Sequence, residues 1–120
     1  YDYFVNTLIH KTVVDPLRVE FPNTPIFTIP TGWAAVDLVK MREDGELLDS
    51  IDFSGPKVSS LFTDTKGHQG QIIIEAGTLM WMNGIYNMDL NSSAYQTGFN
   101  TDLHGLADQI MGDHDTVYKQ

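Results

Sequence analysis

The chain contains no cysteine, and this absence removes several kinds of site at once. Disulfides, iron–sulfur clusters, thiolate zinc sites and a cysteine nucleophile all need that side chain. A small domain without such cross-links must be stabilised by packing or by contacts with other subunits. The absence of cysteine does not establish the cellular compartment of the protein, because extracellular proteins and virions can also lack cysteine.

Basic residues are also scarce. Seven Lys and Arg oppose sixteen Asp and Glu, so the formal net charge is −9. Nucleic-acid binding that does not depend on sequence relies on Lys and Arg at the phosphates, and the acidic balance argues against it. The same charge repels an anionic membrane surface, and no apolar run approaches the ~20 residues of a membrane span. We therefore expect neither nucleic acid nor a membrane as a partner.

Familiar catalytic motifs are missing. The sequence has no Gly-x-Ser-x-Gly elbow, no glycine-rich phosphate loop, and no His-x-His or His-Glu-x-x-His pair. The turn Asp64–His68 holds a Lys and a His, but a chain reversal rich in Gly and Asp is enough to explain it. The group formed by His104, Asp108 and His114 could hold a divalent cation, or it could be the solvated acidic end of a helix. We predict no enzyme, no cofactor and no metal site.

Short apolar segments of period two, separated by turn signals, make up most of the chain. Leu17, Val19 and Phe21 alternate with charged residues, which is typical of a half-buried strand. Asp44-Gly45 supplies the turn of a hairpin that joins residues 33–41 to residues 46–53. About seven short strands at this spacing predict a mostly β protein, either a β-sandwich or a small barrel.

The last twenty residues differ from the rest. Leu103, Leu106, Ala107 and Ile110 follow a helical spacing, and Gly112 is placed to end the helix. We expect a single β-sandwich domain over residues 1–112 that includes this short C-terminal helix. A polar tail follows over residues 113–120.

The order of segments between residues 26 and 91 resembles the immunoglobulin-like domains of tailed-phage virion proteins, particularly baseplate and tail-associated ones. The resemblance is carried by Ile26–Gly32, by the Asp-Gly hairpin at Met41–Leu48, by Gly70–Gly77, and by the Gly-x-Tyr strand at Asn83–Leu90. It implies an immunoglobulin-like β-sandwich. It also implies a structural rather than catalytic role, in a repeated assembly whose subunits present one face to their neighbours.

Two functions follow as expectations. The first is a non-enzymatic structural or adaptor subunit of a phage particle or similar assembly. It would be located in the virion, either as a homo-oligomer or beside other virion subunits. The alternative is a carbohydrate-binding or host-surface-binding module, which would be extracellular or cytoplasmic. The apolar cluster Leu79, Met80, Trp81 and Met82 is either core or a protein interface. The likeliest sugar-stacking residues of the alternative are Trp33, Tyr86 and Tyr95.

Overall fold

Helices, not strands, build the protein. The computed structural model describes all 120 residues, of which about 52% are helical. The only strands, β1 and β2, have three residues each and pair in parallel, with Asp52 opposite Ser60 and Ser54 opposite Phe62. None of the helices is both long enough and apolar enough to cross a bilayer. In chain order the elements are η1 (Phe4–Val14), α1 (Asp15–Glu20), α2 (Gly32–Asp44), β1 (Asp52–Ser54), β2 (Ser60–Phe62), α3 (Gln71–Tyr86), α4 (Leu103–Asp113) and η2 (Thr116–Tyr118).

The predicted mostly β, immunoglobulin-like sandwich is therefore wrong. The resemblance to phage domains rested on an order of strands, and most of those strands are not present. One part of the prediction is retained. A helix does run over Leu103–Asp113, and its N-cap is Asp102, whose side chain accepts a hydrogen bond from the backbone N–H of Gly105.

The expected hairpin at Asp44-Gly45 is the end of a helix. Gly45 adopts a positive φ of 74°, and its N–H bonds back to the carbonyls of Arg42 and Met41. A glycine of positive φ closes a helix as readily as it turns a hairpin, so the dipeptide does not distinguish the two. The buried residues Ala34 and Leu38 are four apart, which is helical spacing and was the stronger signal.

The expected strand at Gln71–Glu75 is the first turn of α3. Its buried positions are Ile72, Ile73, Ala76, Leu79 and Met80, a spacing of one, three, three and one that fits one face of a helix. Three consecutive isoleucines favour a strand by propensity, but burial against other helices overrides it. The helix continues through Asn83-Gly84, and there the glycine allows close packing, since an added Cβ would lie 3.0 Å from the Ile29 side chain.

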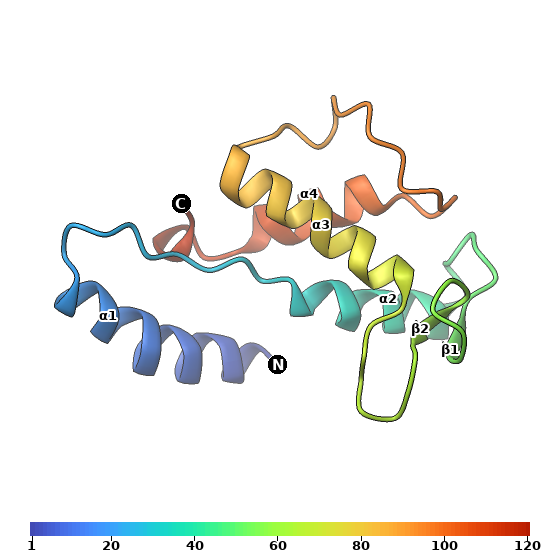
Figure 1. Ribbon diagram of the computed structural model, residues 1–120, viewed down its shortest axis with the longest axis horizontal. Coiled ribbons are helices and arrows are strands. Elements are labelled where there is room, and N and C mark those ends of the chain that lie inside the picture. Colours follow the sequence, from blue (N-terminus) through green and yellow to red (C-terminus); the bar gives the residue numbers. More distant parts are fainter.

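The core lies where α3 packs against α2 and α4 (Figure 1). Leu38 of α2, Leu79 of α3 and Leu103 of α4 are all fully buried there. Strand β2 contributes Leu61 to the same cluster, so β2 is fastened to the helices while all three residues of β1 are exposed. The two strands thus lie at the margin of a helical body, and β2 leads from it into α3.

The N-terminal helix, formed by η1 and α1, lies along one side of this body and is joined to it by a segment without helix or strand, residues 21–31 (Figure 1). Its inner face contacts the C-terminal segment. Arg18 donates from Nε to the carbonyl of Ile26 at 2.8 Å and from Nη1 to the carbonyl of Val117 at 2.9 Å. The side chains of Phe4, Leu8 and Val13 face outward and are between 41% and 51% exposed.

Candidate functional site

The loop between β2 and α3 holds a paired carboxylate and imidazole. Asp64 Oδ2 lies 2.5 Å from His68 Nδ1. The other oxygen of the same carboxylate, Oδ1, accepts hydrogen bonds from the backbone N–H groups of Lys66 at 2.9 Å and His68 at 3.3 Å. Both carboxylate oxygens are therefore occupied, and the group is oriented by its own loop.

This loop is fixed at both ends. Phe62 and Gln69 form an antiparallel bridge, and the N–H of Thr63 donates to the carbonyl of His68 at 2.8 Å. Gly70 donates to the carbonyl of Leu61 at 2.6 Å. The chain at Gly70 passes so close to β2 that an added Cβ would lie 1.8 Å from the Ser60 carbonyl oxygen. The pair therefore projects from a short loop pinned to a strand and a helix.

Hydrogen bonding to His68 favours the ionised form of the Asp64 carboxylate. The hydrogen bond from His68 lowers the pKa of Asp64, and the N–H donors of the loop lower it further. A carboxylate bonded to Nδ1 fixes the neutral ring as the tautomer with its hydrogen on Nδ1, which leaves the lone pair on Nε2. The His68 side chain is 71% exposed and Asp64 39% exposed, so this nitrogen is accessible from outside.

The pair lies in the connection between β2 and α3. Asp64 is two residues beyond Phe62, the last residue of β2, and α3 begins at Gln71. In the adjoining strand pair the ring centroids of Phe53 and Phe62 lie 5.3 Å apart, and Phe53 is itself 50% exposed.

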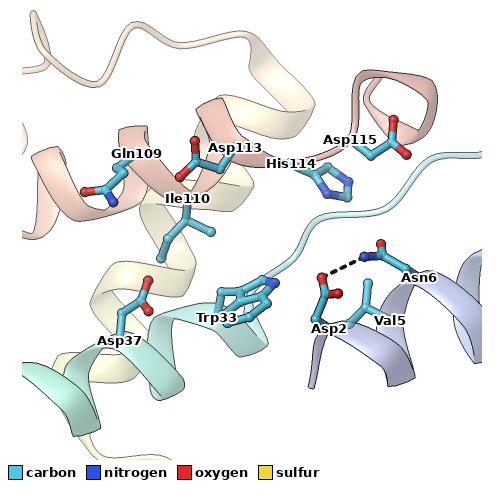
Figure 2. Close-up of a pocket in the computed structure, with 10 residues that line it drawn as sticks. All are labelled: Asp2, Val5, Asn6, Trp33, Asp37, Gln109, Ile110, Asp113, His114 and Asp115. Carbon is cyan, nitrogen blue, oxygen red and sulfur yellow. Dashed lines mark hydrogen bonds between the residues drawn. The ribbon is translucent and has the colours of Figure 1, made fainter.

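A separate cleft lies between the N-terminal helix, α2 and α4. Its volume is about 390 Å³, and Figure 2 shows Asp37 and Asp113 facing it from opposite helices, with Trp33 between α2 and the N-terminal helix. Burial raises the pKa of Asp37, and the charge of Asp113 adds to this effect. None of the carboxylates that line the cleft takes part in a salt bridge. The cleft is acidic, so it does not suit an anionic ligand.

The structure divides the predicted interface cluster. Leu79 and Met80 are fully buried in the core, and Met82 is partly buried against it. Only Trp81 is on the surface, where it is 52% exposed. The four residues therefore do not form one face.

The predicted stacking residues are also separated. Trp33 lies in the cleft and meets the ring of Tyr1 edge-on at 4.8 Å. Tyr86 is 76% exposed at the end of α3, and Tyr95 lies in the loop before α4, where its hydroxyl donates to Glu75 at 2.7 Å. The structure does not bring the three rings to one sugar-sized surface.

The three residues considered as metal ligands face different partners. His104 contacts the carbonyls of Leu90 and Tyr95, at 2.8 Å and 3.0 Å, and Asp108 accepts from Asn91. His114 bonds Thr28 instead. Nowhere in the chain do three or more His, Cys, Asp or Glu side chains converge as metal ligands.

The spacing of Asp64 and His68 was the only sequence signal for the paired site. Both residues belong to a turn, and the need for a chain reversal is enough to explain its composition. The sequence alone therefore did not favour a functional role for them. Comparison with known proteins adds no further signal, since the chain matches no family model, no curated protein and no solved structure. The geometry of the loop is the evidence that remains.

Proposed function

We propose that this chain contributes the histidine base, and the carboxylate that orients it, to a hydrolytic centre of the acyl-transfer type. The observation that carries the proposal is the contact between His68 Nδ1 and Asp64 Oδ2, in a loop that fixes both groups. The same base-and-orienter pair activates the nucleophile in hydrolases of unrelated folds, and it is identified by geometry rather than by position in the sequence.

In this centre His68 is the general base. Nε2 takes the proton from a hydroxyl or thiol as the oxygen or sulfur of that group bonds to the carbonyl carbon of an ester or amide. The imidazolium then gives this proton to the leaving alcohol or amine as its bond to carbon breaks. Asp64 is a positioning residue, because it holds the ring in the correct tautomer and stabilises the transient positive charge. Water completes the cycle by the same two transfers.

The proposal requires a nucleophile from outside residues 1–120, on a partner chain or on a neighbouring part of the same protein. No hydroxyl of this chain hydrogen-bonds Nε2 of His68, and the imidazole is largely exposed. The neighbouring strands support a docking surface at this point. β1 is exposed along its length, whereas β2 is covered by the helices through Leu61. The half-exposed ring of Phe53 lies 5.3 Å from the ring of Phe62.

The orientation of the ring can be measured on the chain itself. We expect ¹⁵N NMR of neutral His68 to show the hydrogen on Nδ1. In Asp64→Asn we expect this preference to be lost, because an amide can donate to Nδ1 as well as accept from it. Lys66→Ala, in the same turn, should leave the spectrum of His68 unchanged, because only its backbone N–H takes part. Equal tautomer populations in the unmutated chain would contradict the assignment.

The function itself is tested by hydrolysis of p-nitrophenyl acetate with the complete protein that carries this chain. Activity that exceeds that of free imidazole at the same concentration, and that is lost in both His68→Ala and Asp64→Asn, supports the proposal. A protein that hydrolyses the ester as fast with His68→Ala as without it overturns the proposal.

A second candidate function, a subunit of a larger assembly, is favoured by one observation. Trp81 is 52% exposed on the outer side of α3, and large exposed aromatic side chains are enriched in protein interfaces. We expect Trp81→Asp to change the free energy of unfolding by no more than about 0.5 kcal/mol, while lowering the molar mass measured by light scattering. An unchanged mass, or an unfolded variant, would remove the argument for this surface.

A further inference from the structure

Two histidines far apart in the sequence share one hydroxyl group. Nε2 of His10, in η1, lies 3.0 Å from Thr28 Oγ1, and Nε2 of His114, just after α4, lies 2.9 Å from the same oxygen. The His10 ring is stacked on Tyr118, with centroids 3.6 Å apart and planes at 10°. His10 is 1% exposed and His114 8%. This cluster is where the N-terminal helix meets the C-terminal segment.

The bridging hydroxyl has one hydrogen to give. It donates to one imidazole nitrogen and accepts from the other, so at least one of the two rings must keep an unprotonated Nε2. Nδ1 of His10 is buried and has no hydrogen-bond partner. An unpaired buried acceptor is tolerated better than an unpaired buried N–H, which places the neutral hydrogen of His10 on Nε2. Protonation of His10 would then put a charged N–H in a position without an acceptor.

The charges around the cluster are nearly balanced. His10 is faced by Lys11 of η1, by Asp15 and Arg18 of α1, and by Asp115 of the C-terminal segment. His114 is faced by His10 itself, by Asp115, and by Lys119. Lys11 and Arg18 also lie over the Tyr118 ring, at 5.5 Å and 5.1 Å from its centroid. The effects of these cations and carboxylates on the two rings largely cancel. Burial therefore has the largest effect, and it lowers the pKa of both histidines.

We infer that His10, Thr28 and His114 form a pH-sensitive latch, which holds the N-terminal helix on the body when both rings are neutral and releases it when they become protonated. The direction follows from linkage. A histidine whose pKa is lowered by folding binds fewer protons in the attached state than in the released one. The attachment is therefore complete above about pH 6.5 and weakens as the pH falls below that value. This latch does not involve the Asp64–His68 pair.

Hydrogen exchange followed by mass spectrometry tests the latch on the whole chain. After correction for intrinsic exchange, we expect protection of residues 4–14 to fall at least about tenfold between about pH 7.5 and pH 5. Residues 71–80 of α3 serve as the internal reference and should keep their protection. Unchanged protection of residues 4–14 over this range overturns the inference.

Two variants separate the latch from general acid sensitivity. His10→Phe keeps an aromatic ring on Tyr118 but can be neither protonated nor hydrogen-bonded to Thr28. Residues 4–14 should therefore be less protected at neutral pH, and their protection should no longer fall as the pH is lowered. Thr28→Val removes the shared hydroxyl, and the N-terminal helix should already be less protected at neutral pH. A His10→Phe chain that loses protection as the unmutated chain does would contradict the latch. If His10→Phe does not fold, as judged by α3, the unmutated chain and Thr28→Val decide the question.

Discussion

Replacing His68 with alanine is expected to lower kcat/KM for p-nitrophenyl acetate by about 10²–10⁴-fold, which is the usual contribution of a general base. The physical reason is that alanine removes Nε2, the atom that takes the proton of the nucleophile in the proposed step. The effect should fall mainly on kcat, because the imidazole acts on charge that develops in the transition state rather than on binding of the ester. The measurement is steady-state kinetics on the complete protein.

Three comparisons make this result specific. Lys66→Ala and Gln69→Ala change exposed side chains of the same loop and should leave kcat/KM close to its original value. Asp64→Asn should lose activity on a scale similar to His68→Ala, because the ring then samples the wrong tautomer. Its effect should appear together with the altered ¹⁵N spectrum of His68. A fall in activity in all four variants would instead indicate that the loop had collapsed.

Placing a methyl group at Gly70 is expected to have the largest effect on stability. The added Cβ would lie 1.8 Å from the carbonyl oxygen of Ser60 and 2.8 Å from its carbonyl carbon, both of which are backbone atoms of β2. The strand or the start of α3 must therefore move. We expect Gly70→Ala to lower the free energy of unfolding by about 1–3 kcal/mol or more, measured by urea denaturation.

Gly112→Ala is the matched control for this substitution. Gly112 lies in the last turn of α4, and nothing lies within 4 Å of the Cβ it would gain. Alanine is favoured over glycine in a helix, so the free energy of unfolding should rise by about 0.5–1 kcal/mol. If Gly70→Ala were as stable as Gly112→Ala, the close approach of the loop to β2 would be wrong. The fixed orientation of the Asp64–His68 pair would then lose its basis.

The fold was predictable only where spacing and capping agreed. Leu103, Ala107 and Ile110 have helical spacing and no competing strand signal, and the helix that they predict is α4, which ends at Asp113, one residue beyond the expected end at Gly112. In α3 the run of isoleucines outweighed the spacing of Ala76 and Leu79, although the spacing was the better guide. Local propensity spans about 1 kcal/mol per residue in a strand, and packing against two other helices exceeds it.

Turn signals misled for a similar reason. Asp44-Gly45 and Asn83-Gly84 both suit a hairpin, yet the first ends α2 and the second lies inside α3. Glycine reports that the backbone needs positive φ or close approach, and it does not report which element needs it. The expectation of an assembly subunit came from the strand order that these turns suggested. Because the structure has helices where those strands were expected, this argument for an assembly subunit is lost. The paired carboxylate and imidazole of Asp64 and His68 are then the feature that points to a particular chemistry.

That pair could not have been recognised from the sequence. Asp and His four residues apart are common in turns, and their significance depends on which imidazole nitrogen meets the carboxylate. The bonds from the N–H groups of Lys66 and His68 to Asp64 depend on the local backbone, and Gly67 provides it with a φ of 84°. Orientation of the base is a property of the folded loop, so only coordinates could show it.

The most direct test of the central claim is the structure of the complete protein that carries this chain, determined at a resolution that shows side chains. The proposal predicts a hydroxyl or thiol, from outside residues 1–120, within about 3 Å of Nε2 of His68. It also predicts backbone N–H donors beside that group, placed to receive the oxyanion. A structure in which Nε2 of His68 faces only solvent, with the Asp64 contact intact, would contradict the proposal.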